Sequence, residues 1–229
     1  MLEELKERVL NQNLLLPQYG LVKLTWGNVS ERDPETGYIA IKPSGVEYED
    51  MTIDDIVILD LDGNVIEGKL NPSSDTKTHL EIYKEFKEIN GIVHTHSTYA
   101  TSWAQSGKDI PCYGTTHADY MYGAIPNLRN LTQEEIKSDY EANTGKLIVE
   151  YFKNHDLSSM PAVLCKNHGI FSWGKDGYKA VENALVLEEV AKLAFITEQL
   201  NEGVEEAPKE IQDKHYFRKH GKDAYYGQK

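Results

Sequence analysis

Apolar residues recur every three or four positions in several parts of the chain, with polar residues between them. Leu2, Leu5 and Val9 follow this period, which predicts an N-terminal helix ending near Pro17. Later segments show the same period and begin with polar residues suited to cap a helix. They predict helices at about 79–86, at 99–105 after Ser97, from the capping box that begins at Thr132, and from Asp176 to about Gln199.

Short runs of apolar and β-branched residues, bounded by Gly, Pro and Asp, predict strands between these helices. The mixed order of strands and helices predicts a single domain over residues 1–229, with either a three-layer α/β/α or an α+β arrangement. The sequence contains no repeat and no low-complexity segment. The predicted strands are 21–25, 38–42, 56–61, 65–66, 92–96, 161–166 and 170–173.

The charge balance argues against two classes of partner. The chain has 229 residues, with 24 Lys and Arg against 37 Asp and Glu, and a formal net charge of −13. Nucleic acids and anionic membranes both require a basic surface, so neither is expected as the main partner.

The two cysteines, Cys112 and Cys165, lie far apart and form no CxxC motif. We therefore predict neither a disulfide framework nor a thiolate zinc site.

Hydropathy gives an expectation about location. The longest apolar runs, such as 56–59, are far shorter than a membrane span. The chain opens with an amphipathic charged pattern, which is not typical of a secretory signal. We therefore expect a soluble, cytoplasmic protein.

Two common phosphate-binding motifs do not account for the sequence. The chain contains no GxGxxG pattern, so a dinucleotide-binding fold has no local support. Residues 169–176 come within one position of a P-loop, but Asp176 stands where the hydroxyl that binds Mg²⁺ belongs. The intervening residues are strand-forming, so we interpret this segment as a strand followed by a helix cap.

The strongest chemical signal is the pair formed by His94 and His96. Side chains two positions apart on a strand lie on the same face, so both imidazoles can reach one cation. His168, in an Asn-His-Gly turn, is a candidate third ligand. Three imidazoles leave one position of a tetrahedral zinc ion open, which is typical of a catalytic site. The alternative interpretation is three unrelated polar histidines.

Short clusters of neutral hydrogen-bond donors suggest a phosphate site. Hydroxyls, amides, exposed glycine backbone and a helix start are the groups that bind a phosphate dianion. Asp75 would either complement the helix dipole or lie between the phosphate and a metal. Taken singly, each cluster is also typical of a turn or helix cap. The candidate residues are Gly27, Asn28, Ser44, Gly45, Ser73 and Ser74, with Lys42 supplying a positive charge.

Eight segments along the chain carry recognisable motifs: 24–30 (LTWGNVS), 42–45 (KPSG), 73–76 (SSDT), 94–97 (HTHS), 114–120 (GTTHADY), 214–216 (KHY), 218–221 (RKHG) and 225–228 (YYGQ). Taken together, these segments resemble the L-ribulose-5-phosphate 4-epimerase family of the class II aldolase/epimerase superfamily, which also includes adducin. The first blocks and the His-x-His motif are shared across the superfamily, whereas 115–120 and 225–228 are specific to the epimerase branch.

The resemblance implies a fold and a reaction. The fold would be a single three-layer α/β/α domain with a central, mainly antiparallel sheet. The enzyme would interconvert L-ribulose 5-phosphate and D-xylulose 5-phosphate in arabinose-type pentose catabolism, by breaking and remaking the C3–C4 bond. The implied cofactor is one Zn²⁺ per subunit, with Mn²⁺ or Co²⁺ as possible substitutes.

The resemblance also implies roles for individual residues. Asp119 and Tyr226 match an acid/base pair that serves opposite faces of the aldehyde fragment. Tyr226 would come from a neighbouring subunit of a cyclic homotetramer, with the sites at subunit interfaces. The candidate phosphate residues above match the substrate phosphate pocket. The implied metal ligands are His94, His96 and His168, with Asp75 as a fourth ligand or a near neighbour.

Three alternative functions remain open from the sequence. The first is a class II aldolase acting on L-fuculose 1-phosphate or a related ketose phosphate. The second is a metal-free interaction module like the adducin head, which the intact histidines argue against. The third is a zinc-stabilised structural domain, which the open zinc position disfavours.

Overall fold

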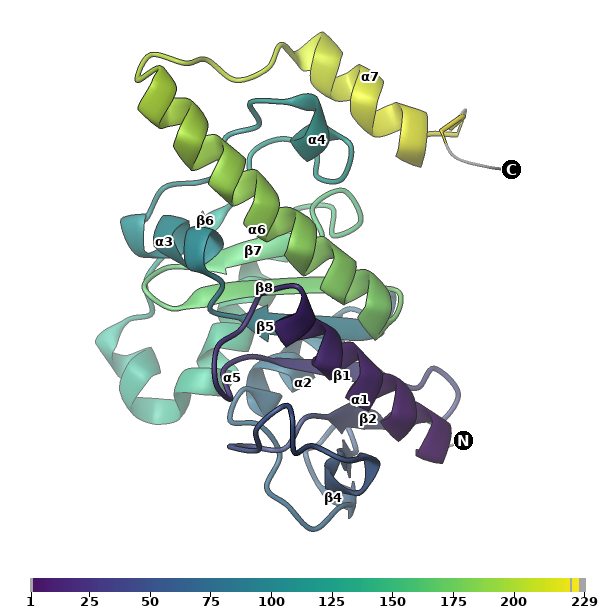
Figure 1. The fold of residues 1–229 in the computed structure, drawn as a ribbon. Coiled ribbons are helices and arrows are strands. Elements are labelled where there is room, and N and C mark those ends of the chain that lie inside the picture. The colour runs from purple at the N-terminus through teal and green to yellow at the C-terminus, as the bar shows by residue number, and fades with distance from the viewer. Residues whose placement is uncertain (1, 223, 227–229) are drawn as a thin grey trace.

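The computed structural model describes residues 2–222 and 224–226. One sheet runs through this part of the chain in the strand order β4-β3-β2-β1-β5-β8-β7-β6 (Figure 1). Neighbouring strands are antiparallel except β6 and β7, which are parallel. The strands are β1 (Asn28–Arg32), β2 (Ile39–Ile41), β3 (Val57–Leu59), β4 (Val65–Glu67), β5 (Gly91–Thr95), β6 (Asn127–Leu128), β7 (Ala162–Cys165) and β8 (Gly169–Gly174).

Helices cover both faces of the sheet. On β8, Ser172 donates a hydrogen bond to the Ala180 carbonyl of α6, whereas the next side chain, Phe171, contacts His79 of α2. Because adjacent side chains of a strand point to opposite faces, α6 and α2 lie on opposite sides of the sheet. Helices α1 and α3 pack with α6, and α5 packs with α2. The helices are α1 (Leu2–Gln18), α2 (Thr76–Glu85), α3 (Thr98–Ser106), α4 (Thr115–Ala118), α5 (Gln133–Phe152), α6 (Gly177–Leu200) and α7 (Lys209–His220), with a short 3₁₀ turn η1 (Ile53–Asp55).

This architecture confirms the predicted α/β fold with helices on both faces of a mainly antiparallel sheet. Two of the predicted caps are also present, whereas Ser97 stands at the start of α3 but its side chain makes no capping hydrogen bond. Asp176 accepts a hydrogen bond from the Lys179 amide, and Thr132 forms a capping box with Glu135. No helix in the described ranges is both long enough and apolar enough to cross a membrane.

The predicted strand at 21–25 is wrong. These residues form an irregular loop, and the strand begins at Asn28. Leu24 has a φ of +50° and Gly27 a φ of +80°, and neither value fits an extended strand. The prediction also missed β6, α4 and α7, because the first two are very short and α7 lacks a regular apolar face.

A buried arginine anchors α2 to the sheet. The Arg32 guanidinium, at the end of β1, donates hydrogen bonds to the carbonyls of Tyr83, Phe86 and Ile89 at 2.9, 3.3 and 2.5 Å. These carbonyls belong to the last turn of α2 and the loop that follows it, where helical partners are lacking. The contact ties one end of α2 to β1. The first residue of β1, Asn28, donates a hydrogen bond to Asp75 at the other end of the same helix.

Candidate metal centre

Three histidine side chains converge beside the end of β5. His94 lies on β5, and His96 is the first residue after the end of this strand. His168 lies in the turn between β7 and β8. One potential ligand atom from each lies within 4.8 Å of the other two, and the His94 and His96 Nε2 atoms are 3.0 Å apart. Nitrogen ligands of a tetrahedral zinc ion lie about 3.3 Å from one another, given Zn–N distances of about 2.0–2.1 Å. The spacing therefore fits a single divalent ion.

A glycine allows this convergence. Gly169 pairs with Cys165 at the end of the β7–β8 ladder. A Cβ atom at Gly169 would lie 2.7 Å from His96 Cδ2 and 2.7 Å from the Thr95 carbonyl oxygen. Any larger residue would push the His168 turn away from β5, so the glycine is a geometric requirement of the cluster.

The protonation of the imidazoles suits metal binding. His94 Nδ1 donates a hydrogen bond of 2.8 Å to the Ile170 carbonyl, which leaves Nε2 with a lone pair when the ring is neutral. Burial, reinforced by the neighbouring imidazoles, lowers the pKa of His96 and lowers that of His168 to about 3. His168 Nδ1 is buried without a hydrogen-bond partner among the described residues. Neutral imidazoles with an unpaired buried nitrogen fit a metal site.

A carboxylate lies beside the histidines. Asp75 precedes α2, and its Oδ2 atom is 4.0 Å from His94 Nε2. It accepts a 2.8 Å hydrogen bond from Asn28, which lies opposite His94 in the β1–β5 ladder. Burial alone would raise the pKa of Asp75, but the imidazoles of His94, His79 and His168 outweigh it and lower the pKa. Asp75 falls outside the cluster defined by the histidines, so direct ligation stays a prediction.

One cavity of about 380 Å³ joins the histidines to the predicted phosphate residues. The structure thus brings together residues that lie up to 141 positions apart in the chain, from Gly27 to His168. The predicted site residues that line this cavity are Gly27, Asn28, Lys42, Ser44, Gly45, Ser73, Ser74, Asp75, His94, His96 and His168.

Five further residues line the cavity without having been predicted as site residues. Thr25, Trp26 and Pro43 adjoin predicted ones, whereas Tyr140 and Glu141 come from a segment with no predicted role. Both lie within α5, directly after a break at Asp139, where φ is −146° and ψ is 86°. The Tyr140 ring lies 5.7 Å from the His168 ring. No motif marks this segment. The break also interrupts a stretch that the sequence pattern after Thr132 predicts as one continuous helix.

Lys42 occupies an unexpected position in this cavity. Its ammonium is buried and donates hydrogen bonds to the carbonyls of Pro43 and Val46 at 3.3 and 2.7 Å. Burial lowers the pKa of Lys42. The side chain therefore shapes the loop that carries Ser44 and Gly45, and its direct contact with a phosphate stays a prediction.

Asp119 and Tyr226 lie together but away from the histidines of their own chain. The Asp119 carboxylate accepts hydrogen bonds from Arg218 at 3.0 and 2.7 Å and from His215 at 3.1 Å. The exposed Tyr226 ring lies 4.9 Å from the Arg218 guanidinium carbon. Neither residue lines the cavity. In Figure 1, α4 and α7, which position this pair, lie at the top of the view, with β1, β5 and α2 below them.

The chain belongs to the family described as the class II aldolase and adducin N-terminal domain, whose model matches residues 7–195. Among solved structures, an L-fuculose 1-phosphate aldolase is 28% identical, with a TM-score of 0.77 over 93% of this chain and 94% of that one. L-fuculose 1-phosphate aldolase from Glaciozyma antarctica PI12 is 20% identical, with a TM-score of 0.77 over 93% and 80% of the two chains.

A sugar-phosphate aldolase from Thermotoga maritima is also similar. It is 20% identical, with a TM-score of 0.68 over 90% of this chain and 98% of that one. Together with the family match, these likenesses define the chain as a class II aldolase-type protein with a histidine cluster able to hold a metal ion.

Proposed function

We propose that the protein is an L-ribulose-5-phosphate 4-epimerase that uses one Zn²⁺ per subunit. One observation carries the choice of epimerase within the superfamily. The two segments that resemble the epimerase branch alone, around Asp119 and Tyr226, are far apart in sequence but meet at Arg218. Their contact supports a shared role for an acid/base pair.

The proposed chemistry follows from the substrate. The C4 carbon of the ketose carries a hydroxyl and has no adjacent carbonyl, so its proton is not acidic. Cleavage of the C3–C4 bond, rotation of the aldehyde fragment and re-addition invert C4 without removing that proton. A divalent ion held by His94, His96 and His168 would act as a Lewis acid on the ketose oxygens.

The protein residues have the remaining tasks. Ser44, Gly45, Ser73 and Ser74 would hold the phosphate, so that the aldehyde fragment stays bound while it rotates. Asp119 and Tyr226 would take and return the C4 hydroxyl proton on its two faces. Partial burial raises the pKa of Asp119, but hydrogen bonds from Arg218 and His215 outweigh it and lower the pKa, so the carboxylate is ionised at neutral pH.

The same geometry supports a cyclic homotetramer. Asp119 and Tyr226 do not line the cavity of their own chain, so in the proposed enzyme a neighbouring copy would supply them to each site. In a closed ring each subunit receives the pair from one neighbour and gives its own to the next.

The second candidate function is a class II aldolase acting on a ketose phosphate such as L-fuculose 1-phosphate, favoured by the 28% identical structure. Both enzymes cleave a carbon–carbon bond, and they differ in whether the aldehyde is released. With L-ribulose 5-phosphate as substrate, we expect xylulose 5-phosphate to form without accumulation of free glycolaldehyde phosphate. Release of the aldehyde at the rate of substrate loss would favour the aldolase.

Asn28→Ala tests the phosphate end of the cavity. The Asn28 amide donates to Ser73 Oγ at 3.0 Å, so its loss should disorder a proposed phosphate ligand. We expect KM for L-ribulose 5-phosphate to rise about tenfold, because the proposed hydrogen bond from Ser73 to the charged phosphate, worth about 1.5–3 kcal/mol, would be weakened. Zinc content should be unchanged, since Asn28 is not a proposed ligand. An unchanged KM would place the phosphate elsewhere.

A further inference from the structure

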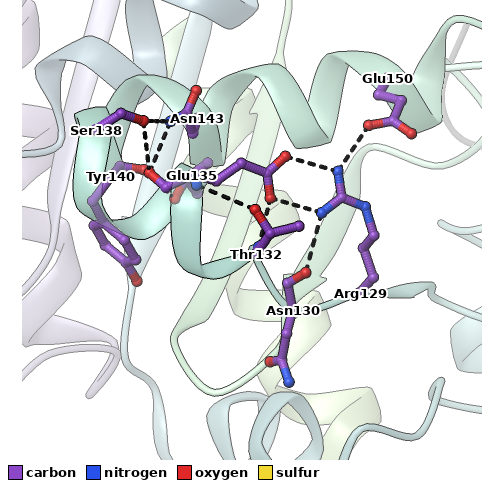
Figure 2. Close-up of polar contacts among 9 residues, drawn as sticks. Arg129, Asn130, Thr132, Glu135, Ser138, Tyr140, Asn143 and Glu150 are labelled. Atoms are coloured by element: carbon purple, nitrogen blue, oxygen red, sulfur yellow. Dashed lines mark hydrogen bonds and ion pairs between the residues drawn. The ribbon is translucent and has the colours of Figure 1, made fainter.

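The loop before α5 and the first turns of α5 form a hydrogen-bonded cluster, shown in Figure 2. Arg129 donates to both carboxylate oxygens of Glu135 at 2.9 and 3.0 Å, and to Glu150 at 3.1 Å. Pairing with Arg129 lowers the pKa of Glu135 to about 2, so the ion pair is intact at neutral pH. We call this cluster the Arg129 clamp, and its members are Arg129, Asn130, Thr132, Glu135 and Asn143.

The clamp spans the break in α5. Thr132 and Glu135 cap the first turn by exchanging hydrogen bonds of 3.2 and 2.6 Å. Asn143, beyond the break, donates a 2.8 Å hydrogen bond back to the Glu135 carbonyl. The clamp therefore holds the two halves of α5 at the angle that places Tyr140 against the His168 ring.

The clamp also reaches the turn that carries His168. Asn130 bonds to Arg129 through its carbonyl at 3.1 Å, and its side-chain oxygen accepts a 2.8 Å hydrogen bond from Asn167. Asn167 directly precedes His168 and has a φ of +61°, the left-handed conformation that the turn requires. The backbone N–H of Asn167 donates to the Ala104 carbonyl at 3.3 Å.

His168 depends on this support more than the other two histidines do. His94 and His96 are placed by β5, whose neighbours β1 and β8 pair with it on both sides. His168 lies in a turn, and its buried Nδ1 has no partner in the described part of the chain. Its ring is therefore placed by the conformation of the turn and by Tyr140.

We propose that the Arg129 clamp positions His168 and thereby sets the affinity of the cluster for its metal ion. Asn130 and Asn167 are positioning residues, because they act through the turn and do not touch the ion. The inference rests on the proposed metal site. It adds residues outside the cavity to those that determine the affinity of this site for its metal ion.

Two variants test the link between Asn130 and Asn167. Asn130→Ala removes the acceptor from an exposed side chain, and Asn167→Gly removes the donor while keeping the left-handed backbone accessible. Each should weaken Co²⁺ binding about tenfold, the lower end of the effect expected for groups that orient metal ligands. Co²⁺ affinity is measured by competition with a chromophoric chelator, and its visible absorption reports the ligand geometry.

The matched variants separate positioning from general stability. Asn130→Asp keeps the acceptor and should keep wild-type affinity. Asn64→Ala removes a similar exposed hydrogen bond of 2.8 Å, to Asp60, far from the histidines in the chain, and should leave Co²⁺ affinity unchanged. The double variant of Asn130→Ala and Asn167→Gly should bind no more weakly than either single variant, because both remove the same contact.

The results distinguish this inference from the proposed metal site. Wild-type Co²⁺ affinity in both Asn130→Ala and Asn167→Gly would overturn the positioning role, as would a lower melting temperature of the metal-free protein with unchanged affinity. Failure of the wild-type protein to bind Co²⁺, or equal binding by His96→Asn, would instead overturn the metal site itself.

Discussion

Tyr226→Phe is expected to lower the turnover of L-ribulose 5-phosphate by about 10²–10⁴-fold, the usual effect of losing a general acid or base. The substitution keeps the ring beside Arg218 and removes only the hydroxyl. Asp119→Asn should reduce turnover comparably, by removing the proton acceptor for the other face. Metal content and oligomeric state should be unchanged in both variants, because neither residue is a proposed ligand. Steady-state kinetics, metal analysis and light scattering measure these quantities.

Mixed oligomers test where the pair acts. Subunits carrying Tyr226→Phe, mixed with subunits carrying His96→Asn, should regain activity at about one site in four in a cyclic assembly with random mixing. Such a site combines intact histidines of one subunit with the intact pair of its neighbour. Absence of recovery in verified mixed oligomers would contradict transfer of the tyrosine between subunits.

The structure adds a sharper control to this experiment. Asp119 and Tyr226 meet at Arg218 within one chain, so both should serve the same neighbouring site. Mixing Asp119→Asn with Tyr226→Phe subunits should therefore restore no activity, since every pair then contains one defect. Recovery in this mixture would mean that the two residues reach a site from different subunits.

His96→Asn is expected to lower metal affinity by at least about tenfold and to abolish epimerisation, because it removes a direct ligand. The exposed His155 is a matched control, and His155→Asn should leave both properties unchanged. Metal content after dialysis against a chelator, with circular dichroism as a check of folding, measures the effect. Full metal occupancy in His96→Asn would contradict the assignment of the cluster.

Metal retention should also depend on pH in a defined direction. Protons compete with the metal only when the imidazoles become charged. Burial lowers the pKa of His96 and lowers that of His168 to about 3, so the neutral form of both rings is present above these lowered values. Proton competition at these two residues should therefore be weak between pH 8 and 6 and should increase as the pH falls toward their pKa values. Loss of metal near pH 6.5 would indicate ordinary, exposed imidazoles at these positions.

Local sequence patterns were sufficient to predict the structure where the conformation of a segment depends mainly on its own residues. The capping residues Thr132 and Asp176 were predicted because a helix start is decided within a few neighbouring positions. The same-face placement of His94 and His96 follows from the alternation of side chains on a strand. The strand predicted at 21–25 failed because apolar residues there fold into a loop whose backbone turns at Leu24 and Gly27.

The patterns of hydrophobic, polar and histidine residues were enough to predict a mixed α/β fold, the members of the histidine cluster and the clusters of donors that share its cavity. Three contacts became visible only in the folded chain: Tyr140 and Glu141 in the cavity wall, the hydrogen bond from Asn167 to Asn130, and the ion pair of Asp119 with Arg218. Each of these contacts joins segments that are distant in the chain or follows a helix break without a local signal. Such contacts depend on how the helices and strands pack against one another. The residues next to them in sequence carry no pattern that would indicate the contact.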